Sequence, residues 1–175
     1  MDIFFCYFDQ WAFEGYKSAE SNFEDTHVMG IKMKTFEELL DESTRIHGHI
    51  CAGQVIGVRM CLLGLSLIGI DDPKGSDRKK LYVIVEIDRC ATDAIQSVTG
   101  CSLGKRSMKW LDYGVMAATF VNLETTIAFR ITALEEARDS SKKYCAEILN
   151  KYQRQLEAYK IMDEKELFHP LFCKS

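Results

Sequence analysis

The first clear periodic pattern along the chain predicts a helix over residues 35–48. Thr35 and Glu38 form a capping box, in which the hydroxyl and the carboxylate satisfy backbone amides at the start of a helix. Apolar residues then recur at helical spacing up to Ile46, and Gly48 provides a natural stop.

A nearly uninterrupted apolar stretch covers residues 50–70 and is about long enough to span a membrane. Arg59 lies near its middle, where a charge is costly in a bilayer, and glycines dilute the apolar signal. We therefore interpret the stretch as a buried helix of a globular domain and expect no membrane association. Gly53, Gly57 and Gly64 suit the close approach of a sheet or of a second protomer.

Strand patterns follow in the second half of the chain. Residues 81–87 are a short β-branched run typical of a buried strand, and three further strands are predicted at 107–111, 115–123 and 125–132. We expect residues 112–114 to join the first two of these three as a tight turn.

Two more helices complete the pattern. Thr92 or Asp93 can cap a brief helix that ends at Gly100, and one apolar stripe predicts a long charged helix over 134–162. Helices before, between and after strands indicate an α+β fold, a single domain with a mixed sheet flanked by helices.

We divide the chain into an aromatic arm at 1–34, a core domain at 35–162 and a tail at 163–175 that we expect to fray. The arm mixes aromatic and acidic residues without a clean period. It can be a helix docked on the domain or a segment that packs on a partner protomer, and the sequence does not choose between these.

Composition narrows the functional classes. The 175 residues carry a net charge of −4, which disfavours nucleic-acid and anionic-membrane binding. Seven cysteines without a CxxC pair argue against a secreted disulfide framework. The start of the chain lacks a basic region and a cleavage site, so we read no signal peptide and expect a cytoplasmic protein.

The densest chemical signal is His47-Gly48-His49-Ile50-Cys51, which lies between two predicted helices. Two imidazoles and a thiolate can converge there on zinc or another borderline transition metal. The alternative is a helix C-cap followed by a buried cysteine. Clustering favours the metal, which still needs a fourth ligand or a water.

Cys51 and Cys90 each stand at the predicted start of a helix, where free amides and the helix dipole favour a thiolate. Asp88, Cys90 and Asp93 can therefore face the 47–51 turn, although an ordinary N-cap explains Asp93 at least as well. The loop at 99–106 has glycines and cations that can hold an anion, but we favour a plain turn.

Three motifs now occur in a recognisable order: HGHICAG at 47–53, CATDAIQ at 90–96 and TGCSLG at 99–104. They resemble the FmdE family patterns HGHxCPG, CxxDAIQ and TGCTxGN. This family takes its name from one component of molybdenum or tungsten formylmethanofuran dehydrogenase, of the methanogenic carbon dioxide pathway. Ala52 replaces the usual proline, and we find no counterpart of the C-terminal zinc finger that many relatives carry.

The resemblance implies a thioredoxin-like outline, a homodimer with the site near the boundary between protomers, and a metal bound by the His/Cys motif. It carries over the site candidates His47, His49, Cys51, Cys90, Asp93, Gln96 and Cys101. We assign His47, His49, Cys51 and Cys90 to the metal, and Asp93, Gln96 and Cys101 to cofactor binding.

Three functions remain open from the sequence. The first is a metal-binding auxiliary protein of formylmethanofuran dehydrogenase-type C1 metabolism, which can contact the components of that enzyme. The second is a stand-alone enzyme in which Cys51 with His49, or a metal-bound water, acts on a small molecule. The third is a dimeric interaction module whose clustered Cys and His are structural.

Overall fold

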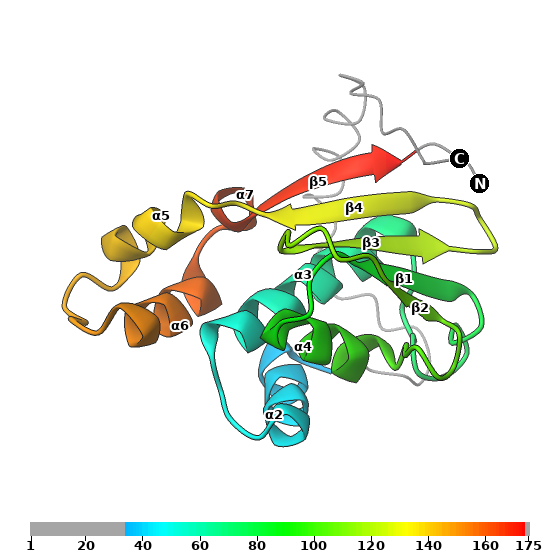
Figure 1. Ribbon diagram of the computed structural model, residues 1–175, viewed down its shortest axis with the longest axis horizontal. Coiled ribbons are helices and arrows are strands. Elements are labelled where there is room, and N and C mark those ends of the chain that lie inside the picture. Colours follow the sequence, from blue (N-terminus) through cyan, green and yellow to red (C-terminus); the bar gives the residue numbers. More distant parts are fainter. Residues whose placement is uncertain (1–33, 174–175) are drawn as a thin grey trace.

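The fold is built around one buried helix that packs against a five-stranded sheet (Figure 1). The computed structural model describes residues 34–173. Its helices are α2 (Phe36–His47), α3 (Ala52–Ile68), α4 (Cys90–Thr99), α5 (Ala137–Tyr144), α6 (Lys151–Ile161) and α7 (Glu164–Leu167). Its strands are β1 (Leu81–Val85), β2 (Met108–Trp110), β3 (Ala117–Asn122), β4 (Ala128–Ala133) and β5 (Phe168–Cys173), in the spatial order β2-β1-β3-β4-β5.

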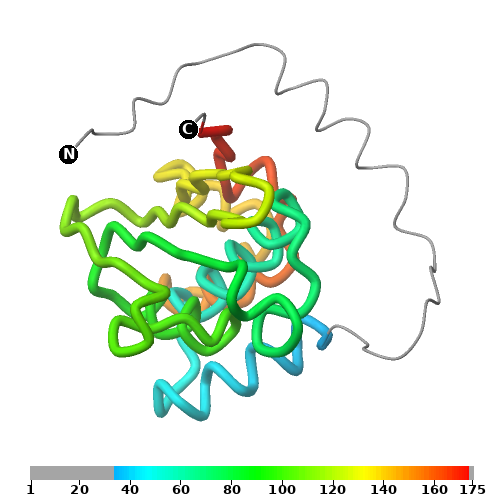
Figure 2. The backbone as a smooth tube through the Cα atoms, turned by 90° about the vertical axis from the view of Figure 1, so that its right-hand side faces the viewer, coloured from blue at the N-terminus to red at the C-terminus, as the bar shows by residue number. Residues whose placement is uncertain are grey.

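Three of the helices, α2, α3 and α4, pack against one another, and α3 also packs against the sheet. α3 packs against β3 and β4, α4 packs against α3, and α2 contacts both of these helices. α2 and β5 lie at opposite ends of the described fold (Figure 1, Figure 2). The predicted α+β class, with a mixed sheet and flanking helices in one domain, is confirmed.

The glycines of α3 explain how closely it is packed. A Cβ atom on Gly64 would lie 2.3 Å from the ring of Phe120 in β3, and one on Gly57 would lie 2.6 Å from the carbonyl oxygen of Ala91 in α4. Both distances are far below van der Waals contact, so the helix needs glycine at both points. The expected close approach is confirmed, with the sheet on one side and α4 on the other.

Arg59 is the charged exception in this apolar helix. Its guanidinium donates to the carbonyl oxygens of Tyr159 and Met162, at 2.9 and 2.5 Å, at the end of α6. A cation at the carbonyl end of a helix is well placed electrostatically. Partial burial lowers the pKa of Arg59. No helix among the described residues is long and apolar enough to cross a membrane.

The pairing of β2 corrects the predicted hairpin. β2 pairs with β1 in parallel, not with β3, and α4 forms the crossover between the two parallel strands. Residues 112–114 carry the chain across the end of β1, where Tyr113 and Val115 donate to the carbonyl of Glu86. A short polar link between two strand patterns therefore does not imply that the two strands are neighbours.

The tail is also more ordered than expected. Phe168–Cys173 forms β5, which pairs antiparallel with β4 along its whole length. Pro170 lies opposite Ile131, and an edge strand tolerates a proline because one of its sides needs no partner. The prediction that the tail frays is wrong for these residues.

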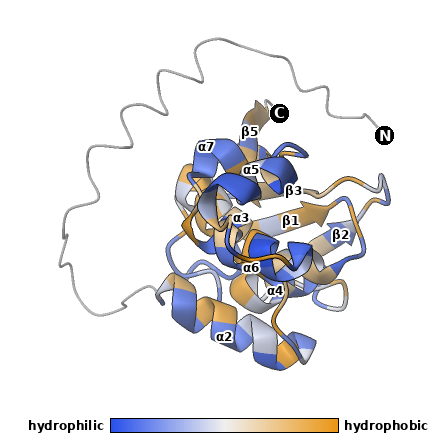
Figure 3. Cartoon of the chain, turned by 90° about the vertical axis from the view of Figure 1, so that its left-hand side faces the viewer, coloured by the Kyte–Doolittle hydropathy of each residue, from blue (hydrophilic) through white to orange (hydrophobic). Residues whose placement is uncertain are grey.

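The predicted long C-terminal helix over 134–162 is two helices, α5 and α6, which pack against each other. The break occurs before Asn150, whose side chain accepts from the amides of Tyr152 and Gln153 and caps α6. A cap within an otherwise helical pattern restarts the helix in a new direction. Figure 3 shows mostly hydrophilic residues on α5 and α6.

Candidate metal centre

The candidate site lies where the ends of three helices meet. α2 ends at His47, and Gly48, with φ of 90°, turns the chain in a left-handed conformation that favours glycine. α3 begins after Cys51, and α4 begins at Cys90. Potential ligand atoms of His47, Cys51 and Cys90 all lie within 4.8 Å of one another. Residues far apart in the sequence thus form one group that can hold a metal ion.

His47 is prepared for coordination by its hydrogen bonds. Its Nδ1 lies 2.8 Å from the Oδ2 of Asp93. Because a carboxylate only accepts, Nδ1 carries the proton and the lone pair of the neutral ring is on Nε2. Nε2 is buried and has no hydrogen-bond partner. A buried acceptor without a partner is costly, and a metal ion would satisfy it.

Asp93 is therefore not the N-cap residue of α4, which is one of the roles that the sequence allowed for it. The N-cap residue of α4 is Arg89, so the helix begins earlier than expected and Asp93 lies in its first turn. From there its carboxylate reaches across to the end of α2. The capping interpretation is wrong for both Thr92 and Asp93, and the hydroxyl of Thr92 instead donates to the carbonyl of Ile87 at 2.5 Å.

Both thiols lie at the starts of helices. Cys51 is the N-cap residue of α3 and Cys90 the first residue of α4, so each lies where a helix leaves backbone amides without partners inside the helix. Burial, and after it the neighbouring Cys51, raise the pKa of the Cys90 thiol. A metal ion held by these residues would oppose this effect, because coordination would replace the thiol proton.

Close packing and one buried amide hold the thiols in place. A Cβ on Gly53 would lie 2.8 Å from the Cβ of Cys90 and 3.7 Å from the Sγ of Cys51. Gln54 is fully buried, and its Nε2 donates to the carbonyl oxygen of Cys90 at 2.6 Å. Its Oε1 accepts from the hydroxyl of Ser43 in α2. Gln54 thus ties all three helices together.

Sequence reasoning missed Gln54. The available signal was its polarity, since an amide inside a nearly continuous apolar helix must find buried partners.

His49 lies beside this group rather than in it. Its ring centroid is 4.5 Å from that of His47, and the residue is exposed. Among the described residues, the group of mutually close ligand atoms contains His47, Cys51 and Cys90. The structure therefore brings together three of the four residues that the sequence assigns to the metal.

Gln96 and Cys101 lie toward the other end of α4. The backbone carbonyl of Gln96 accepts from the amide of Gly100 at the C-cap. Cys101 is buried, and its thiol donates to the carbonyl of Leu81 at 3.9 Å. At about 1.5 Å per residue, Gln96 lies about 9 Å along the helix axis from Cys90, and Cys101 lies beyond the last residue of α4. Asp88 is exposed in the loop before α4.

A hollow of about 430 Å³ adjoins the group on the side of Cys51. It lies between the residues 50–53, which include Cys51, and α6, from which Tyr152 and Leu156 contribute. Its size falls in the range of about 300–1,000 Å³ typical of small-molecule sites. A ligand in this hollow would be in contact with Cys51.

Comparison with known proteins supports the family that the motifs indicated. The family described as "FmdE, Molybdenum formylmethanofuran dehydrogenase operon" matches residues 46–169. A "Probable S-adenosyl-L-methionine-binding protein" of Archaeoglobus fulgidus is 35% identical over 115 residues, which cover 65% of this chain and 31% of that protein. This chain thus spans about a third of the length of that relative.

A solved structure has the same fold. The crystal structure of an FmdE-like protein from Syntrophus aciditrophicus, described by its likeness to a tungsten formylmethanofuran dehydrogenase component, matches with a TM-score of 0.60 and 20% identity. The match extends over 84% of this chain and 78% of that one. The family match covers well over half of the chain and includes His47, Cys51 and Cys90. The chain therefore belongs to the FmdE family.

Proposed function

We propose that this protein binds zinc or another borderline transition metal through the Nε2 of His47 and the thiolates of Cys51 and Cys90. Two observations carry the proposal: the Nε2 of His47 is buried without a hydrogen-bond partner, and a ring nitrogen of His47 and the thiols of Cys51 and Cys90 all lie within 4.8 Å of one another. Asp93 fixes the tautomer that leaves this nitrogen free. One imidazole and two thiolates suit such metals better than magnesium or calcium.

Three protein ligands are typical of a site that keeps a coordination position for water or a ligand. When bound, the metal would supply Lewis acidity there. The chain's own residues have separate tasks: Asp93 orients His47, Gln54 holds the backbone at Cys90, and the hollow beside Cys51 admits a small molecule.

We further propose that the protein is an auxiliary factor of molybdenum or tungsten formylmethanofuran dehydrogenase or of related C1 metabolism. The family description and the name of the Syntrophus aciditrophicus protein support this role. Contact with the components of such an enzyme and a cytoplasmic location belong to the same proposal.

A homodimer with the site near the boundary between protomers is also part of the proposal. Several apolar side chains near the site are exposed in the single chain, among them Ile46 at 70%, Ile50 at 42%, Leu149 at 93% and Tyr152 at 69%. Ile46 and Ile50 flank the ligand turn, and Tyr152 lines the hollow beside Cys51. Burial of these side chains against a second copy would remove apolar surface from water.

Metal analysis tests the proposal. Protein purified without a metal-binding tag should carry close to one transition-metal ion per chain by elemental mass spectrometry, and His47→Ala should lose it. Cys61→Ala is the matched control, because Cys61 is fully buried in α3 and burial raises the pKa of its thiol. Equal metal content in the His47→Ala and Cys61→Ala proteins would refute the site.

The hollow beside Cys51 favours a second candidate function, an enzyme that acts on a small molecule at the same site. The name of the Archaeoglobus fulgidus relative makes S-adenosyl-L-methionine one ligand to test. Saturable binding in calorimetry that is lost when Tyr152, in the hollow wall, is changed to Ala would support this candidate. Heat signals that are unaffected by Tyr152→Ala would count against it.

A further inference from the structure

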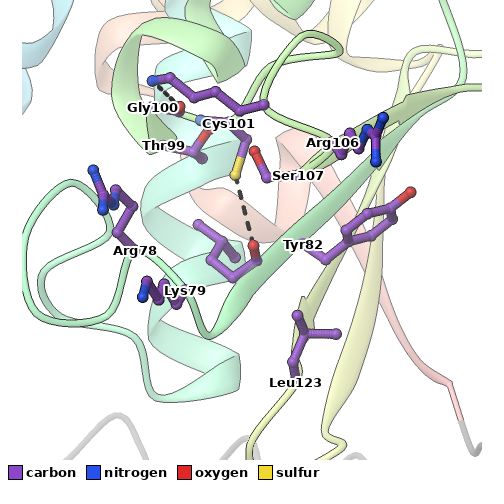
Figure 4. A pocket seen from close by; sticks show the side chains of 11 residues that line it. Arg78, Lys79, Tyr82, Thr99, Gly100, Cys101, Arg106, Ser107 and Leu123 are labelled. Atoms are coloured by element: carbon purple, nitrogen blue, oxygen red, sulfur yellow. Dashed lines mark hydrogen bonds between the residues drawn. The ribbon is translucent and has the colours of Figure 1, made fainter.

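A second hollow, of about 400 Å³, lies at the opposite end of α4 from the candidate metal centre. It is formed by the loop before β1, by the end of α4 and by the loop that leads to β2. Figure 4 shows Arg78 and Lys79 on one side of it and Arg106 and Tyr82 on the other. The hollow has no residue in common with the His/Cys group.

Its lining is strongly cationic. Arg78, Lys79, Lys105 and Arg106 all contribute, and among the described residues no Asp or Glu does. This gathering occurs in a chain whose net charge is −4. Like charges held in one hollow repel one another, so a bound anion would stabilise the arrangement.

Most of these cations are not neutralised by the protein. Within residues 34–173, the side chains of Arg78, Lys79 and Arg106 have no hydrogen-bond or ion-pair partner, whereas that of Lys105 donates to the carbonyl of Gly100 at 2.9 Å. Neighbouring lysines outside the hollow behave differently. Lys80, for example, pairs with Asp77 and with Glu124. Carboxylates are thus available nearby but are used elsewhere.

The backbone conformation of Arg106 is a second unusual feature of this hollow. Its φ is 57°, a left-handed conformation that a residue with a long side chain rarely adopts. The turn is held by the amide of Arg106, which donates to the carbonyl of Leu103, and by the amide of Ser102, which donates to the hydroxyl of Ser107. Such strain concentrates at ligand sites, and glycine would relieve it.

We propose that this hollow binds a phosphorylated small molecule. Arginines that flank a hollow from two sides suit phosphate oxygens, with which guanidinium groups form paired, charge-assisted hydrogen bonds. Tyr82 and Leu123 line the same hollow and provide an apolar surface for the organic part of the ligand. The volume is that of a small-molecule site rather than of a nucleic-acid groove.

The sequence raised an anion at the 99–106 loop as an alternative to a plain turn, but it did not indicate the second loop, with Arg78 and Lys79. Arg78 and Arg106 are 28 positions apart, and only the parallel pairing of β1 with β2 brings the loops before these strands together. The sequence pattern by itself favours a plain turn for residues 99–106.

Titration with inorganic pyrophosphate, followed by backbone amide NMR shifts, tests the proposal. We expect saturable shifts confined to residues 78–82 and 99–107, with an affinity that falls as salt rises. Arg106→Gly should weaken the affinity about tenfold, through loss of a charge-assisted contact. It should leave the melting temperature unchanged or raised, because glycine suits the left-handed backbone.

Two further variants make the test specific. Lys142→Gln removes one charge from an exposed ion pair with Asp139 on α5 and should leave the affinity unchanged. The same shifts are expected in the His47→Ala protein, which excludes pyrophosphate binding through a metal ion. Shifts spread over all surface lysines, equal losses in Lys142→Gln and Arg106→Gly, or no saturable shift at millimolar pyrophosphate would overturn the proposal.

Discussion

At the scale of single residues, the proposed metal binding depends on which nitrogen of His47 is free. The carboxylate of Asp93 lies 2.8 Å from Nδ1, and Nε2 is buried without a partner. A carboxylate behind a ligating histidine fixes the tautomer and raises the basicity of the other nitrogen. In the proposed centre, Asp93 would therefore position His47 and would not be a ligand.

Asp93→Asn should weaken metal affinity about 10- to 100-fold, because an amide in place of the carboxylate no longer holds the proton on Nδ1 as strongly. A competition titration against a metal-binding dye measures this change. Asp88→Asn is the matched control, since Asp88 is also a carboxylate near the start of α4, but within residues 34–173 the carboxylate that contacts His47 is that of Asp93. Equal effects of the two variants would mean that general negative charge matters and the contact with His47 does not.

The sequence alone identified part of the candidate metal centre, and the other residues could be recognised only in the folded structure. The short spacing between His47 and Cys51 brings two donor side chains together through local geometry, and the His/Cys cluster at 47–51 can be recognised from the chain alone, although His49 lies outside the group. Asp93 was ambiguous, because whether a carboxylate caps its own helix or contacts another depends on where the helix begins. The role of Gln54 can be recognised only in the folded structure, where its side chain bonds Ser43 of α2 and the carbonyl oxygen of Cys90 in α4.

At the scale of elements, the candidate site depends on how closely α3 and α4 approach each other. Gly53 and Gly57 are the positions on α3 where any side chain would collide with α4. The site is therefore sensitive to substitutions that leave all proposed ligands intact.

Gly57→Ala should reduce the free energy of unfolding by about 1–3 kcal/mol, because its methyl group would lie 2.6 Å from the carbonyl oxygen of Ala91 and overpack the interface. Metal affinity should fall as well, as Cys90 moves with α4. Chemical denaturation measures the stability. Gly104→Ala is the control, because a Cβ there meets no atom within 4 Å. Equal stability of the two variants would contradict the tight α3–α4 contact.

A second element-scale prediction concerns the ion pair between Arg130 in β4 and Glu86, which directly follows β1. Arg130 donates through Nε and Nη2 to both carboxylate oxygens of Glu86, each at 2.6 Å, and Glu86 is buried. Glu86→Ala should cost about 2–3 kcal/mol in unfolding experiments, less than for a fully buried pair, because the side chain of Arg130 is 28% exposed.

The exposed pair between Lys80 and Glu124 provides the comparison. Its side chains are 39% and 63% exposed, so Glu124→Ala should change the stability by less than about 1 kcal/mol. If Glu86→Ala lowers the free energy of unfolding no more than Glu124→Ala does, the Glu86–Arg130 pair does not stabilise the sheet.

The elements themselves were predictable where the pattern is local. The capping box at Thr35, the stop at Gly48 and the apolar helix α3 all occur as expected. Strand pairing was not predictable, because β1 and β2 become neighbours only through the crossover helix α4. The break before Asn150 was missed because a polar cap does not interrupt a stripe read at helical spacing.

At the scale of the whole molecule, the proposed dimer concerns the apolar surface near the ligand turn and the start of α6. Leu149 is 93% exposed there, so its side chain adds almost nothing to the stability of the single chain. If a second copy of the chain covers Leu149, the side chain stabilises the dimer and not the folded single chain.

We expect the wild-type protein to sediment as a dimer. Leu149→Asp should raise the dissociation constant of this dimer at least about tenfold, because it would bury a charge in the interface. Leu103→Asp provides the control, since Leu103 is 59% exposed and lies beyond the opposite end of α4. A monomer mass for the wild type at all concentrations would contradict the dimer.

If His47, Cys51 and Cys90 bind one metal ion, as we propose, X-ray absorption spectroscopy of the purified protein should detect their sulfur and nitrogen atoms around it. We predict close to one transition-metal ion per chain with two sulfur ligands at about 2.3 Å and at least one imidazole nitrogen at about 2.0–2.1 Å, as for zinc. Cys51→Ser should remove one sulfur or the metal, and Cys61→Ala should change neither. A metal without sulfur ligands, or a spectrum unchanged by Cys51→Ser, would contradict the proposed centre.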